Sequence, residues 1–205
     1  MSGIVGLPPR RTDHESLVDP QEGAQQELAE RVLARKHLLP YVMRNVPGYL
    51  AGWFHKMLCQ ELEAFSNEVA EARHPRLIIM APPRSGKSEL FSRNFPAWHM
   101  GRWPDHEVIA CSYGSDLAQD FSRKVRGLID SPENKLIFPD VHLAVDSRAA
   151  DRWQLDTFRG GYVAAGTGGP ITGRGMSIGI IDDYFKNDKQ ADSQKERDAL
   201  WSWYN

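Results

Sequence analysis

The chain has 205 residues, of which 41% are hydrophobic and 25% charged, and this composition excludes a wholly disordered protein. The formal net charge of −2 excludes a protein that coats nucleic acid through bulk positive charge, but it does not exclude a local basic patch on the surface. Two cysteines are too few for a disulfide framework or a four-cysteine zinc site, and no apolar run approaches the ~18 residues of a membrane span. We therefore expect one main soluble domain from a reducing compartment.

The N-terminal part of the chain is predicted to be helical. Residues 1–18 have few large apolar side chains, and we expect them to form a mobile arm. A helix should begin at Pro20, because Asp19 suits the N-cap and Glu22 completes a capping box. Three residues give this helix an apolar side before the next proline, namely Leu28, Val32 and Leu39.

A second helix is predicted after the Pro47-Gly48 turn. Apolar residues recur there at spacings of three or four, which is typical of one buried face; they are Leu50, Phe54, Leu58, Leu62, Phe65 and Val69. The two helices make up a helical segment over residues 19–72, which leads into a core over residues 73–205.

From His74 onward, short apolar runs alternate with helical patterns. Strands are predicted at RLIIM (76–80), EVIACSY (107–113), GYVAA (161–165) and SIGII (177–181). The first run is wholly apolar, as in a strand that is buried on both faces of a sheet. This alternation predicts an α/β fold with a mostly parallel sheet flanked by helices.

Two further helices are predicted within this core. One should begin with Ser115 as its cap, and its inward face is Leu117, Phe121, Val125 and Leu128. The other should follow Ser193, which forms a capping box with Glu196, and run to the end of the sequence.

A phosphate-binding loop is predicted where the first strand runs into APPRSGKSEL (81–90). Gly86 lets the backbone approach phosphate oxygens, and the N–H groups at the start of the following helix attract the anion. Lys87 would reach the β- and γ-phosphates, and Ser88 would place its hydroxyl on Mg²⁺. The match to the usual phosphate-loop pattern is imperfect, because Ala81 stands at its first glycine.

Two carboxylates follow the last predicted strand. SIGII leads into Asp182 and Asp183, which puts both at the carboxyl edge of the sheet, where open α/β sheets bind ligands. Asp182 would hold Mg²⁺ directly or through water, and Asp183 would polarise the attacking water. The EVIACSY strand fits between the loop and these carboxylates, an arrangement typical of the helicase and motor branch of P-loop ATPases.

Two arginines are candidates for stabilising charge on the γ-phosphate. Arg84 lies inside the predicted phosphate loop. Arg174 is the one charged residue of GTGGPITGRG (166–175), a glycine-rich stretch whose backbone must turn tightly or lie against a neighbour. From that stretch Arg174 would act either in its own site or in the site of a neighbouring subunit.

Several blocks of the sequence together resemble the large subunit of tailed-phage terminases, the motors that package DNA. An arginine before Gly-Lys-Ser, and TGRG followed by Asp-Asp, are the most specific features. The blocks occur in the family's order and are PGYLAGWFHKMLCQELE (47–63), RLIIMAPPRSGKSEL (76–90), FPAWHMGRWPDHEVIACSYGSDLAQDF (95–121), ADRWQL (150–155), GTGGPITGRGMSIGIIDDYFK (166–186) and the ADSQ…WSWY tail.

The resemblance implies a Mg²⁺-dependent ATPase domain that drives double-stranded viral DNA into an empty capsid. It implies a P-loop NTPase fold of the additional-strand type, as in RecA and helicases. As partners it implies DNA, the portal protein, the small terminase subunit and further copies of the chain in a ring, with no membrane. The implied location is the host cytoplasm, transiently at the portal of the procapsid.

The resemblance also implies site residues. Lys87 and Ser88 correspond to the Walker-A ligands of phosphate and Mg²⁺, and Asp182 to the Walker-B metal carboxylate. Asp183 stands where many relatives have a catalytic glutamate, and its carboxylate reaches ~1.5 Å less far. The remaining positions are a nucleotide-sensing Arg84, a trans-acting Arg174, the nucleotide-binding Pro83, Ser85, Gly86 and Glu89, and the base-contacting region of Trp53 and His55.

The terminase large subunits continue into a further ATPase motif and an RNase H-like nuclease, neither of which this sequence matches. The chain stops at WSWYN inside an apparent helix, so we expect it to be part of a longer protein and not to cut DNA by itself. We expect Asp140, Asp146 and Asp151 to be surface groups. The basic run of Arg123, Lys124 and Arg126 is interpreted as a solvated helix face or a DNA contact.

Two other functions stay open at this point. One is a helicase-like, DNA-remodelling P-loop ATPase, which a second RecA-like domain would distinguish. The other is a nucleotide-binding assembly module that binds ATP without turnover, which a hydrolysis assay would distinguish.

Overall fold

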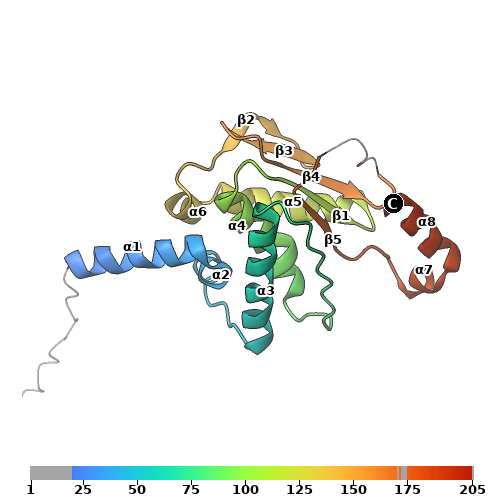
Figure 1. Ribbon diagram of the computed structural model, residues 1–205, viewed down its shortest axis with the longest axis horizontal. Coiled ribbons are helices and arrows are strands. Elements are labelled where there is room, and N and C mark those ends of the chain that lie inside the picture. The colour runs from blue at the N-terminus through green and yellow to red at the C-terminus, as the bar shows by residue number, and fades with distance from the viewer. Residues whose placement is uncertain (1–19, 170, 172–174, 205) are drawn as a thin grey trace, which may run out of the picture.

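The computed structural model describes residues 20–169, 171 and 175–204, so the predicted arm and Asp19 lie outside the described residues. Its first part is helical, with α1 (Pro20–Lys36), α2 (Leu38–Asn45) and α3 (Trp53–Ala70). A second helical stretch contains a π-helical segment, η1 (Glu89–Asn94), followed at once by α4 (Phe95–Arg102). Figure 1 shows α1 projecting from the body that the other elements form. No helix among the described residues is long and apolar enough to cross a membrane.

A mixed sheet lies at the centre of the α/β core and has the strand order β2-β3-β4-β1-β5. Its strands are β1 (Glu107–Ser112), β2 (Leu143–Arg148), β3 (Arg152–Leu155), β4 (Gly161–Gly166) and β5 (Ile178–Ile181). β1 pairs in parallel with β4 on one side and with β5 on the other, whereas β2 and β3 add antiparallel strands at one edge. The remaining helices are α5 (Ser115–Ile129), α6 (Pro132–Ile137), α7 (Asp188–Asp192) and α8 (Gln194–Tyr204).

The predicted α/β class, the three parallel strands and the helix after β1 are confirmed. β2 and β3 were not predicted, because a four-residue strand such as β3 is too short to show a period and is held by pairing with β4. The core packs between the sheet and α5. Trp153 of β3 stacks on Tyr162 of β4 with ring centroids 5.3 Å apart, and its indole N–H donates to Ser122 of α5.

The prediction of a buried strand at residues 76–80 is wrong. The segment is not part of the sheet, and it makes no hydrogen bond to another strand of the described chain. Leu77 and Ile79 pack against the core, but Ile78 and Met80 are 85% and 89% exposed. Hydrophobicity favours burial of such a run, but a strand also requires a partner for its backbone groups, and the described residues supply none.

The apolar patterns of the N-terminal helices are only partly confirmed. Leu28 and Val32 of α1 are exposed, and the helix ends at Lys36, so the predicted apolar side is wrong there. In α3 the predicted buried face is confirmed by Leu58 and Leu62, whereas Leu50 precedes the helix and is exposed. α1 is anchored near its C-terminal end, where the carbonyl of Ala34 accepts a hydrogen bond from the indole of Trp98.

Of the two helix caps predicted in the core, the cap before α8 is confirmed and the cap of α5 is wrong by one residue. α5 begins at Ser115, but Gly114 is its N-cap, so Ser115 is the first helical residue rather than the cap. Before α8, the Ser193 hydroxyl accepts a hydrogen bond from the backbone N–H of Glu196 at 3.4 Å, as predicted for the capping pair.

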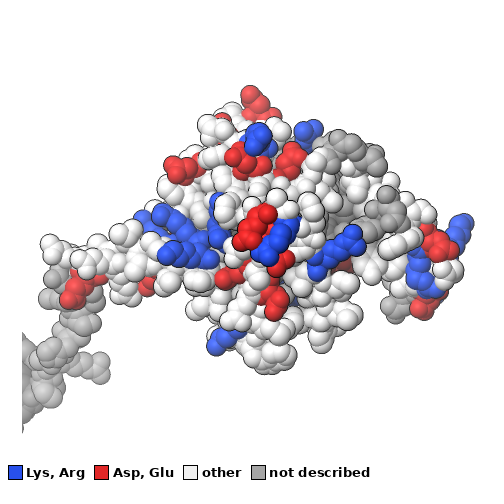
Figure 2. Space-filling model, in the orientation of Figure 1, with Lys and Arg blue, Asp and Glu red and all other residues white. Residues whose placement is uncertain are grey.

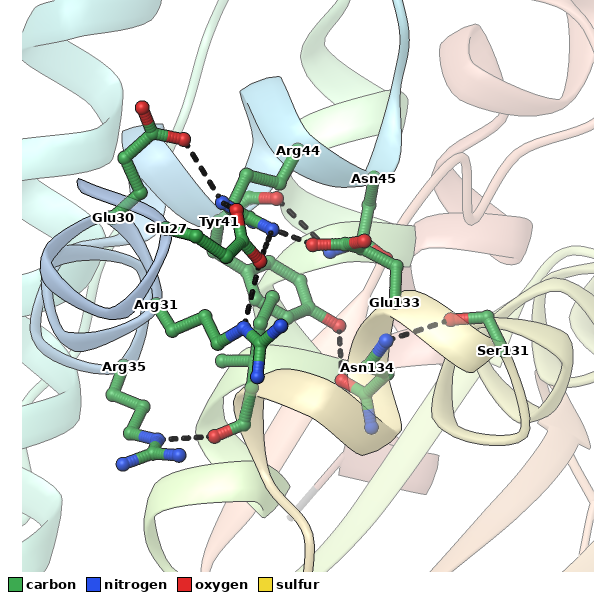
Figure 3. A network of polar contacts seen from close by, with 11 residues as sticks. Glu27, Glu30, Arg31, Arg35, Tyr41, Arg44, Asn45, Ser131, Glu133 and Asn134 are labelled. Atoms are coloured by element: carbon green, nitrogen blue, oxygen red, sulfur yellow. Dashed lines mark hydrogen bonds and ion pairs between the residues drawn. The ribbon is translucent and has the colours of Figure 1, made fainter. Parts of the chain in front are cut away.

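An arginine of α2 joins the N-terminal helices to the core. Figure 3 shows Arg44 between Glu27 and Glu30 of α1 and Glu133 of α6, at nitrogen–oxygen distances of 2.7, 3.0 and 2.5 Å. Beneath it, the buried hydroxyl of Tyr41 donates to Asn134 at 2.8 Å. Hydrogen bonds from Arg44, and secondarily from Arg31, lower the pKa of Glu27 to about 2.

We expect Arg44→Met to lower the free energy of unfolding at pH 7, because three carboxylates lose their shared cation. Since the pKa of Glu27 is depressed in the folded state, this stability is present above the unfolded value of about 4.3 and is lost as the pH falls towards 2. Urea unfolding should therefore show a smaller difference from wild type at pH 3 than at pH 7.

Arg73→Met is the matched control, because Arg73 pairs with Glu71 where both side chains are more than half exposed. It should change stability by no more than about 0.5 kcal/mol. An Arg44→Met penalty that stays constant down to pH 3 would show that the carboxylates are not its source.

Candidate functional site

The 81–88 loop connects residues 76–80, which have no regular secondary structure, to a helix that begins at Lys87. Gly86 has a φ of 81°, a left-handed conformation that favours glycine. Its carbonyl accepts the first helical hydrogen bond, from the N–H of Leu90 at 3.2 Å. The helix therefore begins immediately after Gly86. The N–H groups of its first turn have no partner within the helix and can bind an anion. The predicted helix after the loop is confirmed, but the strand before it is not.

Asp182 and Asp183 follow β5 at the carboxyl ends of the parallel strands. The backbone places them firmly, because Asp182 N–H donates to Cys111 O at 3.0 Å and Tyr113 N–H donates to Asp183 O at 2.9 Å. Asp182 is only 3% exposed, whereas Asp183 is largely exposed and has a φ of 49°. Aspartate tolerates this left-handed conformation better than most residues. The two adjacent carboxylates thus lie in different environments.

Lys87 connects the loop with these carboxylates. Its ammonium nitrogen lies 2.9 Å from Asp182 Oδ1 and 3.8 Å from Asp183 Oδ1. Burial by itself would raise the pKa of Asp182, but hydrogen bonds from Ser92, Lys87 and Ser88 outweigh it and lower that pKa. For Lys87, burial would lower the pKa, and the bond to Asp182 and its charge raise it. Both side chains are therefore held in their charged forms.

Ser92 belongs to this cluster and was not predicted. Its hydroxyl donates to Asp182 Oδ2 at 2.5 Å, and both residues are buried. Ser88 and Ser92 are four residues apart, which places them on one face of a helix, so their spacing was a signal available in the sequence. Ser92 lies within the π-helical segment η1, which follows Ser88 and ends at Asn94, two residues before Pro96, a residue that has no N–H to donate to the preceding turn.

The other predicted residues of the loop region differ in exposure and in hydrogen-bond partners. Pro83 and Arg84 are exposed, and Arg84, with a φ of 61°, has no ion-pair partner in the part of the chain that is described. Ser85 buries its hydroxyl without a hydrogen-bond partner among the described residues. Glu89 turns towards its own helix, where its carboxylate accepts hydrogen bonds from Arg93 and Asn94.

Trp53 and His55, predicted to lie near a base, have different surroundings. Trp53 is 77% exposed at the start of α3. His55 lies against the loop, with Nε2 2.9 Å from the carbonyl oxygen of Ser85 and Nδ1 accepting from the N–H of Gly52. Among the described residues, His55 therefore forms a hydrogen bond with the 81–88 loop, and Trp53 forms none.

The glycine-rich stretch begins at the same edge of the sheet. Thr167 N–H donates to Ser112 O at the end of β1, and the indole N–H of Trp203 in α8 donates to Gly169 O at 3.0 Å. Arg174 lies outside the described residues, so its place relative to Lys87 stays a prediction.

Charged residues outside the cluster lie mainly on the surface. Asp140, Asp146 and Asp151 are exposed, as predicted, and the described residues contain no group of three metal-ligating side chains. In the basic run, Arg123 pairs with Asp120, Lys124 lies over Phe121 and Arg126 donates to Ala149 O. Figure 2 shows basic and acidic side chains mixed over the visible face.

The cluster fits a nucleotide phosphate with Mg²⁺. A hydroxyl and one buried carboxylate are few protein ligands, but Mg²⁺ is usually held by one or two carboxylates together with phosphate oxygens and water. Ser88 and Asp182 are close enough for the hydroxyl to lower the pKa of the carboxyl group, and Lys87 supplies the cation for phosphate. The arrangement therefore has the donor set for a Mg²⁺–phosphate ligand.

Comparison with known families gives a match that covers most of this chain. The model of the family described as terminase large subunit, T4likevirus-type, N-terminal, matches residues 78–205, which is more than half of the sequence. The match contains the 81–88 loop from its first residue and both aspartates, but not α1, α2 or α3. Comparisons with curated proteins and with solved structures give no match.

Proposed function

We propose that this chain, a member of the T4-like terminase large subunit N-terminal family, is a Mg²⁺-dependent ATPase. Its hydrolysis of ATP would power the movement of double-stranded DNA into a viral procapsid. Family membership supports a role in DNA packaging. The finer fold that we propose is a P-loop NTPase of the additional-strand type. We extend the proposal to the portal protein, the small terminase subunit and a ring of identical chains as partners, working in the host cytoplasm at the procapsid portal.

The single observation that carries the ATPase proposal is the contact between Lys87 and Asp182. These residues lie far apart in the sequence, and the fold brings the ammonium and the buried carboxylate to 2.9 Å. A salt bridge alone has many structural explanations. Here it joins a helix N-terminus behind a left-handed glycine to the carboxyl edge of a parallel sheet, and that is where α/β proteins bind nucleotides.

The proposal gives each side chain of the cluster a task. Lys87 would bind the β- and γ-phosphates, and Ser88 with Asp182 would hold Mg²⁺, which when bound neutralises charge on the phosphate oxygens. Asp183 is exposed beside Lys87 and would orient and polarise a water molecule for attack on the γ-phosphate. Ser92 would keep Asp182 in place through its hydrogen bond.

Without a ligand, Lys87 neutralises Asp182, and both groups lose water on doing so. A triphosphate would compete with Asp182 for Lys87. Once Lys87 binds the phosphates, the Asp182 carboxylate would need a new cation. Binding of phosphate and of Mg²⁺ should therefore be mutually favourable. Arg84 and Arg174 are the proposed arginines for the charge that develops on the γ-phosphate.

Phosphate release from ATP tests this function. We expect the 205-residue chain to hydrolyse ATP only when Mg²⁺ is present, and the rate to vanish with excess EDTA. The assay should be repeated over a wide range of protein concentration, with Arg73→Met as a surface control. A rate per molecule that rises with concentration would support Arg174 acting in a neighbouring subunit, whereas a constant rate would indicate a self-sufficient site.

Measurable ATP binding without any turnover above background would contradict the ATPase proposal. The chain would then fit the nucleotide-binding assembly module better. Absence of both binding and turnover would contradict the nucleotide site as a whole.

A further inference from the structure

The ring of His55 is held by a different backbone group at each nitrogen. The N–H of Gly52 donates to Nδ1 at 3.0 Å, so Nδ1 carries the lone pair and the ring proton is on Nε2. Nε2 therefore donates to the carbonyl oxygen of Ser85, which is 2.9 Å away. The rings of Tyr49 and Phe54 flank the imidazole edge-on, with centroids at 5.6 and 5.7 Å. The side chain is thus fixed in one orientation and one tautomer.

The same ring also fills the space beside Gly86. A Cβ atom at Gly86 would lie 3.0 Å from His55 Nε2, which is closer than nine in ten real Cβ contacts. Together with its φ of 81°, this leaves glycine as the residue that fits. His55 therefore determines the position of the Ser85–Gly86 peptide through a hydrogen bond and through direct packing.

The orientation of this peptide has a consequence for phosphate binding. In a trans peptide the C=O and N–H groups point in opposite directions. Because the Ser85 carbonyl points at His55, the N–H of Gly86 points away from α3, and it makes no hydrogen bond to the described residues. That leaves a free donor in the loop, immediately before Lys87.

We propose that His55 is a positioning residue, which fixes the Ser85–Gly86 peptide so that the Gly86 N–H is presented to a bound triphosphate. The proposal rests on the nucleotide site proposed above, and it replaces the contact between His55 and a base that the sequence predicted. Neither ring nitrogen is available to a base, because Gly52 occupies Nδ1 and Ser85 occupies Nε2. His55 acts on the ligand through the loop and not by touching it.

Affinities for ATP and for tripolyphosphate, measured by calorimetry on the 205-residue chain, test this role. His55→Ala should weaken both ligands by a similar factor of about tenfold, since one positioning hydrogen bond is lost in each case. A residue that contacts the base would instead weaken ATP and leave tripolyphosphate unchanged. Met57→Ala is the matched control on the same turn of α3, because Met57 is exposed, and it should change neither affinity by more than about twofold.

His55→Gln separates the hydrogen bonds from the general stability of the loop. A glutamine side chain carries an amide NH₂ group that donates and a carbonyl oxygen that accepts, so it can serve both the Ser85 carbonyl and the Gly52 N–H. We expect its affinities for both ligands to stay within about threefold of wild type, even if the alanine variant does not fold. A glutamine variant with an intact fold that binds no better than alanine, or losses confined to ATP, would overturn the proposal.

The two proposals fail in different ways. A wild-type chain that binds neither ATP nor tripolyphosphate would overturn the nucleotide site, and with it the role of His55. A wild-type chain that binds both ligands, with an equally competent His55→Ala variant, would leave the site intact and overturn the positioning role alone.

Discussion

Replacing Lys87 with alanine is expected to abolish ATP hydrolysis and to weaken binding of the triphosphate at least about 100-fold. Lys87 is the one ammonium within 4 Å of Asp182 among the described residues, and it is held in its charged form there. Its loss would remove the proposed cation for the β- and γ-phosphates in a partly buried site, where a charge-assisted contact is strong. Steady-state phosphate release and calorimetric binding of ATP measure the two effects.

The same variant should also be less stable, and this effect must be separated from the loss of activity. Asp182 is 3% exposed, so removal of Lys87 leaves a buried carboxylate with only hydroxyl partners, at a cost of about 1–3 kcal/mol in unfolding free energy. Lys87→Ala with Asp182→Asn removes both charges and should recover much of that stability without recovering activity. Hydrolysis by the stable double variant above background would contradict the proposed site.

Asp183→Asn should slow hydrolysis by a factor of about 10²–10⁴ and leave ATP affinity within about threefold of wild type. The carboxylate is exposed and 3.8 Å from Lys87, so its charge adds little to binding in the ground state. Asparagine also accepts the left-handed conformation that Asp183 adopts at a φ of 49°, so the backbone should be unchanged. Single-turnover hydrolysis at saturating ATP measures the chemical step directly.

Asp120→Asn is the matched control for this prediction. Asp120 is also an exposed aspartate paired with one cation, Arg123, but it lies on α5 outside the cluster. It should retain full activity. If Asp183→Asn hydrolysed ATP at a rate within threefold of wild type, the carboxylate would not be the group that activates water.

Most residues of the candidate site were identifiable from local sequence. Gly86, Lys87 and Ser88 stand before a helical pattern, and Asp182 follows an apolar run, so the sequence indicated both halves of the cluster that the fold brings together. The role of Ser92 was not found, because its partner is ninety residues away in the chain. His55 was found through the terminase resemblance but was predicted to contact a base, and only the fold shows its contact with Ser85.

By itself, the sequence of this protein determined three helices of the core, three of its strands and the types of functional group available at the sheet edge; the helices follow the 81–88 loop, Gly114 and Ser193. These features depend on neighbouring residues, through apolar periodicity and capping, and local patterns carry them. Only the tertiary structure decided that residues 76–80 stay outside the sheet and that the apolar residues Leu28 and Val32 remain exposed. It also decided that His55 forms a hydrogen bond with Ser85 of the loop. Each of those outcomes depends on whether a distant segment supplies a hydrogen-bond partner or a surface to pack against. Local sequence patterns do not specify such contacts with distant segments.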